Sequence, residues 1–179
     1  MIFETNFFEP LNKNNHEKNN YNFSLSGCTG PEGPPGVPGD DGLIGSVIEI
    51  KNVNFFNDPV DGFILYHKFA KTIYDSDVVL VYRLSGTINS TTPIWQPIPR
   101  TLFLAQGELD YDFDFSKQDV TIYAGGTYNL ALTPQYINNQ TFRIVIVPAD
   151  FVFTVNKNDY SAVMSALNIK ENQIQKINF

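Results

Sequence analysis

The clearest alternation of apolar and polar residues in the chain lies between residues 109 and 115, which read LDYDFDF. Alternation with a period of two predicts a β-strand that buries one of its faces. The segments 78–84 and 141–147 are almost continuously apolar, which is typical of strands covered on both faces. Enrichment in β-branched and aromatic residues predicts further short strands at 46–55, 63–69, 120–123, 151–155 and 173–179.

Two segments depart from this simple pattern. Residues 95–104 contain two prolines, so they are predicted to form an edge strand or a bend. At residue 159 the apolar period changes, and Asp159 is a good N-cap for a helix that runs to about Leu167. On such a helix Tyr160, Val163, Met164 and Leu167 share one face. The whole pattern predicts an all-β fold, a single β-sandwich or a partly open barrel over residues 46–179, with a short C-terminal helix.

A different kind of signal precedes this domain. Leu25, Ser26, Gly27 and Cys28 have the form of a lipobox, the motif at which a signal peptide is cleaved before a lipidated cysteine. Cys28 is the only cysteine, which excludes an internal disulfide. Several acyl chains on one cysteine would give stable anchoring, where a single chain would be marginal. We therefore expect lipid attachment at Cys28 and membrane contact through that anchor.

Glycine then recurs at every third position as far as residue 45, at Gly30, Gly33, Gly36, Gly39, Gly42 and Gly45. A collagen triple helix demands this spacing. However, the run is short, and Glu32, Asp40 and Asp41 would bring like charges together across three chains. An extended single-chain tether over residues 28–45, and a monomeric protein, are therefore favoured. The alternative is a homotrimeric collagen-stalk adhesin or surface fibre with a β head.

Residues 1–27 are expected to be a leader or signal region, although residues 12–20 are too polar for the apolar part of a signal peptide. Read literally, they predict a disordered leader. If residues 16–23 are encoded by AT-rich codons, a shift of one base gives MKKIIIIF, a charged start followed by an apolar run. This favours the hypothesis that residues 1–23 come from a frameshift or a wrongly chosen start.

Charge narrows the class of partner. The chain carries 12 basic and 19 acidic residues, a net charge of −7. Nucleic-acid binding needs a basic stripe, and the arginines, Arg83, Arg100 and Arg143, are scattered along the sequence. We therefore expect no nucleic-acid partner.

Few residues point to chemistry. Asp110, Asp112 and Asp114 place three carboxylates on one strand face, which makes them candidate calcium ligands. The EF-hand pattern fails, because Phe115 stands where that loop needs glycine and Thr121 where it needs glutamate, so a solvated outer face is favoured.

His67 is the only histidine outside the leader, and no nucleophile–histidine–acid set or phosphate loop is recognisable. We expect no catalytic activity and no cofactor. Trp95 and several tyrosines could form a platform for a sugar or protein, although core and rim packing is the simpler interpretation.

A lipobox cysteine, glycine triplets and a β-rich region in this order resemble the small collagen-like-repeat lipoproteins of Gram-negative bacteria. Segments 75–84 (DSDVVLVYRL), 95–101 (WQPIPRT), 140–150 (QTFRIVIVPAD) and 162–168 (AVMSALN) look like recurring blocks of that group. The resemblance covers about residues 25–179. It implies an outer-membrane lipoprotein of the cell envelope with an uncharacterised β-domain, and it transfers no catalytic residue. We expect a binding or structural module whose partner is an envelope protein or glycan.

Overall fold

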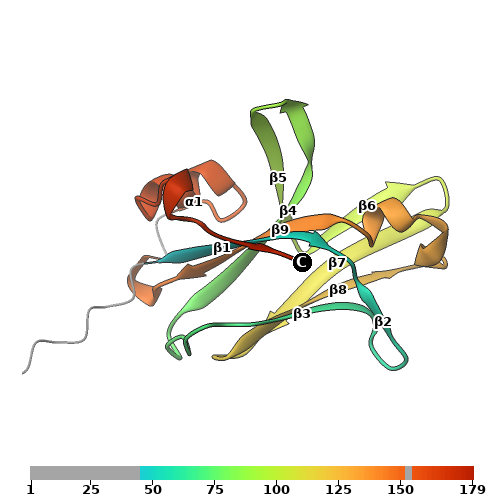
Figure 1. Ribbon diagram of the computed structural model, residues 1–179, viewed down its shortest axis with the longest axis horizontal. Helices are drawn as coiled ribbons and strands as arrows, with labels where there is room; N and C mark the ends of the chain where they lie inside the picture. The colour runs from blue at the N-terminus through green and yellow to red at the C-terminus, as the bar shows by residue number, and fades with distance from the viewer. Residues whose placement is uncertain (1–44, 152–154) are drawn as a thin grey trace, which may run out of the picture. The chain divides into compact units, whose positions relative to one another are not determined.

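The computed structural model describes residues 45–151 and 155–179, which form a β-sandwich of two five-stranded sheets (Figure 1). The first sheet has the strand order β10 (Gln175–Asn178), β1 (Ser46–Val53), β9 (Gln140–Val147), β4 (Val78–Asn89), β5 (Thr92–Ile98). The second has the order β2 (Phe56–Asp58), β3 (Gly62–Lys68), β8 (Asp119–Gly126), β7 (Gly107–Phe115), β6 (Arg100–Leu104). Neither sheet of the described part closes into a barrel, and the predicted all-β sandwich is confirmed.

The strands pair antiparallel, except that β10 runs parallel to β1 at the edge of the first sheet. β4 and β5 form a long hairpin whose tip projects away from the rest of the domain (Figure 1). The chain then bends at Pro99, which follows a cis peptide bond, and continues as β6 in the other sheet. The predicted edge strand or bend over residues 95–104 is therefore both: β5 and β6 are the outer strands of their sheets, and the bend lies between them.

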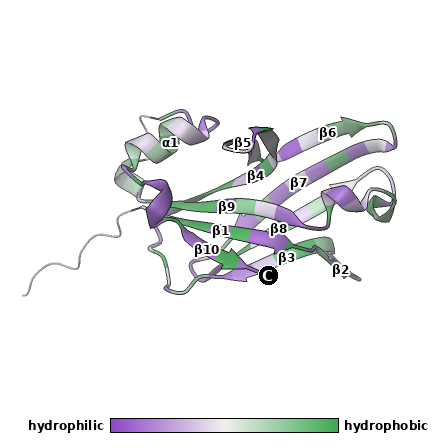
Figure 2. Cartoon of the chain, turned by 45° about the horizontal axis from the view of Figure 1, so that its top comes forward, coloured by the Kyte–Doolittle hydropathy of each residue, from purple (hydrophilic) through white to green (hydrophobic). Residues whose placement is uncertain are grey.

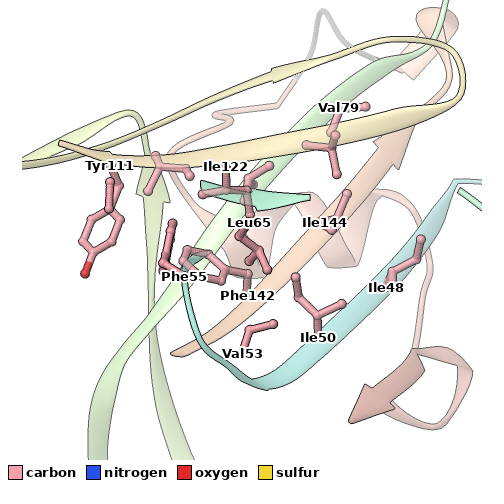
Figure 3. Packing of buried hydrophobic residues seen from close by; sticks show 14 of the residues in the cluster. Ile48, Ile50, Val53, Phe55, Leu65, Val79, Tyr111, Ile122, Phe142 and Ile144 are labelled. Carbon is pink, nitrogen blue, oxygen red and sulfur yellow. The ribbon is translucent and has the colours of Figure 1, made fainter. Parts of the chain in front are cut away.

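The core lies between the two sheets (Figure 3). The first sheet contributes Ile50, Phe142 and Ile144, and the second contributes Leu109 and Ile122, all of them at most 1% exposed. Apolar and polar residues alternate along β7, whereas the C-terminal half of β9 is uniformly apolar (Figure 2). This difference follows from the covering of β9 on both faces.

A short helix, α1 (Tyr160–Ala166), covers part of the outer face of the first sheet. Asp159 accepts a hydrogen bond from the backbone N of Ala162 at 3.0 Å and so caps the helix, as predicted. Val163 and Met164 are buried against a second apolar cluster that includes Tyr82 and Val145, and Tyr160 is half-buried beside them. In the described part of the chain, no helix has the length and apolar character that a membrane crossing requires.

Other details differ from the sequence prediction. The strand predicted over 151–155 is wrong at its start, because a 3-10 helix, η3 (Ala149–Phe151), follows Pro148, and the N of Phe151 donates to the carbonyl of Pro148 at 3.0 Å. The remaining 3-10 helices are η1 (Leu130–Leu132), η2 (Pro134–Tyr136) and η4 (Glu171–Gln173). Phe115 falls at an apolar position of the alternation over 109–115, but it is 42% exposed because it ends the strand.

Candidate functional site

Two buried arginines lie on opposite faces of the first sheet. Arg83 on β4 is 7% exposed and Arg143 on β9 is 4% exposed. Arg83 is paired in register with Phe142, and Tyr82 is paired with Arg143. Because successive side chains of a strand point to opposite faces, Arg83 points between the sheets and Arg143 points outward under α1. A buried charge is costly unless it is paired, so the partners of each arginine are informative.

Arg143 is neutralised by two carboxylates. Its Nε and Nη2 lie 2.6 Å and 2.5 Å from Oε2 of Glu49, the residue opposite it on β1. Its Nη2 also lies 2.6 Å from Oε1 of Glu171 in η4, and its Nη1 donates to the hydroxyl of Tyr160. The guanidinium lies 4.3 Å from the centre of the Trp95 ring. This network connects β1, β5, α1 and η4 to β9, which is a structural role.

Arg83 is held by neutral groups. Its Nε donates to Oε1 of Gln140 at 2.9 Å. The amide of Gln140 cannot turn over freely, because its Nε2 donates to the carbonyl oxygens of Gln135 at 2.8 Å and Asn138 at 2.6 Å. The guanidinium also lies over the ring of Tyr111, 4.7 Å from its centre.

The ring of Tyr111 packs against the guanidinium of Arg83. Tyr111 is also a member of the core cluster between the sheets (Figure 3). Its hydroxyl donates to the carbonyl of Tyr136 at 2.6 Å. Burial raises the pKa of Tyr111 to about 12, although the nearby positive charge of Arg83 acts in the opposite direction. The tyrosine is therefore neutral at pH 7 and supplies no charge to balance Arg83.

No carboxylate within the described residues pairs with Arg83, and besides the bond from Nε to Gln140 its guanidinium contacts the neutral side chains of Tyr111 and Tyr136. Instead Arg83 lines a cleft of about 380 Å³ between the β4–β5 hairpin and β6. A second arginine, Arg100, lines the same cleft, together with the polar residues Ser85 and Gln96 and residues 101–104 of β6. None of the residues that line it is acidic. The cleft is thus a local positive site in a chain of net charge −7.

One residue of this site could be recognised in part from the sequence. Alternation along β4 places Arg83 on the same face as Val79 and Val81, and a charged residue at such an inward position is unusual. Nothing in the sequence indicates that Arg100 lies at the same cleft, because this depends on the bend at Pro99.

The three candidate calcium ligands, Asp110, Asp112 and Asp114, lie on the outer face of β7, on the opposite side of the sheet from the core. Asp112 and Asp114 are exposed and Asp110 is half-buried. Oδ2 of Asp114 accepts a hydrogen bond from the hydroxyl of Tyr123 at 2.8 Å. Within residues 45–151 and 155–179 there is no group of three or more histidine, cysteine, aspartate or glutamate side chains placed to hold a metal ion.

His67 lies half-buried on β3, with its ring edge-on to Phe69 at 6.4 Å between ring centres. Burial lowers its pKa. No hydrogen bond or ion pair to His67 is formed by the residues that the structure describes. It is not among the residues that line the cleft beside Arg83.

The lipobox residues Leu25, Ser26, Gly27 and Cys28 lie outside the described residues, as do the tether glycines from Gly30 to Gly42. Gly45 lies within them and is half-buried. A Cβ atom at this position would lie 2.7 Å from Cδ2 of Leu167 and 3.2 Å from the carbonyl oxygen of Ile146. Close packing therefore gives Gly45 a reason to be glycine that is independent of the triplet pattern.

No protein-family model, curated protein or solved structure matches the chain. The site must therefore be interpreted from its own residues.

Proposed function

We propose that the protein is a membrane-anchored, non-catalytic binding module, in which Cys28 carries the lipid and the cleft beside Arg83 receives the ligand. The observation that supports binding is the buried guanidinium of Arg83, which opens onto a cleft without an acidic side chain. A structural arginine at equal depth, Arg143, has two carboxylate partners. An arginine that serves only the fold would be expected to have at least one.

The anchoring half of the proposal rests on the lipobox sequence and the glycine-triplet tether. It implies an outer-membrane lipoprotein, with the β-domain held away from the membrane by residues 28–45. Its test is metabolic labelling with a palmitate analogue, followed by fractionation and intact-mass measurement. The wild-type protein should carry the label in the membrane fraction, and Cys28→Ser should carry none. An unlabelled wild-type protein whose mature chain begins upstream of Cys28 would contradict the anchor.

The binding half is tested by native mass spectrometry of protein purified gently from its own membranes. The wild-type protein should retain a small molecule of defined mass. Arg83→Met should lose it, whereas Lys117→Met, which removes one positive charge from an exposed surface position, should keep it. Equal occupancy in the wild type and Arg83→Met would contradict a ligand site at this cleft.

A further inference from the structure

We propose that the cleft beside Arg83 binds the carboxylate of an acidic sugar, with Arg83 as its principal ligand-binding residue. This inference rests on the proposed binding function and names the ligand class of that same site. Three features of the cleft support it: the charge that it presents, the geometry of that charge, and the side chains around it.

The positive charge has no counter-charge on the described part of the protein. Carboxylates are plentiful in the chain, which has 19 acidic and 12 basic residues. Asp112 and Asp114, for example, stand exposed on the outer face of β7. None of them is among the residues that line the cleft. An anionic ligand would supply the missing charge and recover part of the cost of burying Arg83.

The geometry favours a planar monoanion. Gln140 accepts from the Nε of Arg83 and fixes the plane of the guanidinium, so that a ligand would bind through Nη1 and Nη2, which have no carboxylate partner within the described residues. Two parallel N–H groups match the two oxygens of a carboxylate. Phosphate also fits such a fork, but its second negative charge is disfavoured by the acidic surface of this chain. Arg100, at the exposed side of the cleft, adds a second donor group.

The other side chains fit the hydroxylated body of a sugar. Gln96 offers an amide that both donates and accepts hydrogen bonds, whereas the hydroxyl of Ser85 already donates to the carbonyl oxygen of Ile94 at 3.1 Å. Tyr136 adds an aromatic side chain to the lining, and Arg100 lies on the same face of β6 as the core residue Leu102. Aromatic side chains with polar neighbours suit a ligand that has both apolar and hydroxyl-bearing faces. A volume of about 380 Å³ lies within the usual range for small-molecule sites, roughly 300–1,000 Å³.

The test is isothermal titration of the purified full-length protein with D-galacturonate, and with D-galactose as its neutral counterpart. Galacturonate should bind at least about tenfold more tightly than galactose, because only the acid forms charge-assisted hydrogen bonds. Arg83→Met should weaken galacturonate binding by about 10- to 100-fold. Lys117→Met, the control of equal charge change, should leave it unaltered. Without ligand, Arg83→Met should melt only a few degrees below the wild type, because Oε1 of Gln140 loses its donor but no carboxylate is left unpaired, whereas loss of an ion-paired structural arginine should lower the melting temperature much further.

A second pair of variants leaves Arg83 in place. Ser85 is exposed at the cleft, and its hydroxyl donates to the carbonyl oxygen of Ile94 at 3.1 Å, so that two substitutions which both remove this bond can be compared for the effect of charge alone. Ser85→Glu places a carboxylate of the protein beside Arg83 and should abolish galacturonate binding. Ser85→Gln matches the glutamate in size without its charge, and it should bind galacturonate at least about tenfold more tightly than Ser85→Glu does.

Other results would overturn the inference. Equal binding of galactose would remove the role of the carboxylate, and tighter binding of inorganic phosphate would show that the site prefers a dianion. Binding of acetate or N-acetylalanine as tightly as galacturonate would show that the cleft recognises a carboxylate but not a sugar. If the native protein retains a small molecule that lacks a carboxylate, this inference fails while the proposed binding function stands. If no molecule is retained and no probe binds, both fail.

Discussion

The ion pair between Arg143 and Glu49 allows a prediction that separates the two buried arginines. In Arg143→Met, Glu49 would remain 3% exposed and would lose its main partner. Removing one member of a buried pair typically costs about 3–5 kcal/mol. Lys51, whose Nζ lies 2.9 Å from the other oxygen of Glu49, would still compensate in part, so we expect about 3 kcal/mol. For a domain of this size, that loss corresponds to a melting temperature lower by roughly 10–15 °C.

The pH dependence tests the cause of this loss. Burial acts to raise the pKa of Glu49, but hydrogen bonds from Lys51 and Arg143, and their charges, outweigh it and lower the pKa below the ordinary 4.5. The stability that ionised Glu49 gives the wild-type protein is therefore present above pH 4.5, and it is lost as the pH falls through the lower, folded-state pKa of this residue. In Arg143→Met burial should dominate and raise the pKa of Glu49, so that the variant recovers as the pH falls toward 4.5. The difference in free energy of unfolding between the wild type and Arg143→Met should therefore become smaller from pH 7 to pH 4.5.

The assay is urea unfolding of the full-length chain at both pH values, with circular dichroism as the readout. The double variant Glu49→Leu/Arg143→Met is the control, because replacing both charges with apolar groups should restore most of the lost stability. A loss below about 1 kcal/mol in Arg143→Met would refute the reasoning, since surface substitutions alone reach about half of that. So would a gap that stays constant between pH 7 and pH 4.5.

Three further predictions concern packing and capping. Tyr111→Phe should lose about 1–2 kcal/mol in urea unfolding, because the buried carbonyl of Tyr136 loses its donor at 2.6 Å. Gly126→Ala should cost on the order of 2–3 kcal/mol, because its Cβ would lie 2.4 Å from a backbone carbonyl oxygen of β7. Gly125→Ala, with open space around its Cβ, should be nearly neutral by the same measurement. Asp159→Ala should cost about 1 kcal/mol and increase amide hydrogen exchange in the first turn of α1.

The strands could be predicted from the sequence because their signals are local. The alternation over 109–115 and the apolar run over 141–147 depend only on which faces are covered, and both became strands. The N-cap at Asp159 is likewise a matter of neighbouring residues. The pairing of strands is not local. The parallel addition of β10 beside β1 joins the last residues of the chain to the first strand of the domain, and no pattern within either segment indicates it.

The binding site, too, depends on contacts between residues that are far apart in the sequence. Arg83 and Arg143 point to opposite faces because of the register between β4 and β9, and their different roles depend on residues far away in the sequence. Glu49 lies 94 residues before Arg143, and Glu171 lies 28 residues after it. Arg83 has one comparable distant partner, Gln140, which is 57 residues away and uncharged. Since a neutral amide fixes a guanidinium without neutralising it, this pairing keeps the charge of Arg83 both oriented and uncompensated. An arginine retained in that state, at the edge of a cleft without acidic side chains, is suited to recognising an anion and adds little to the stability of the fold.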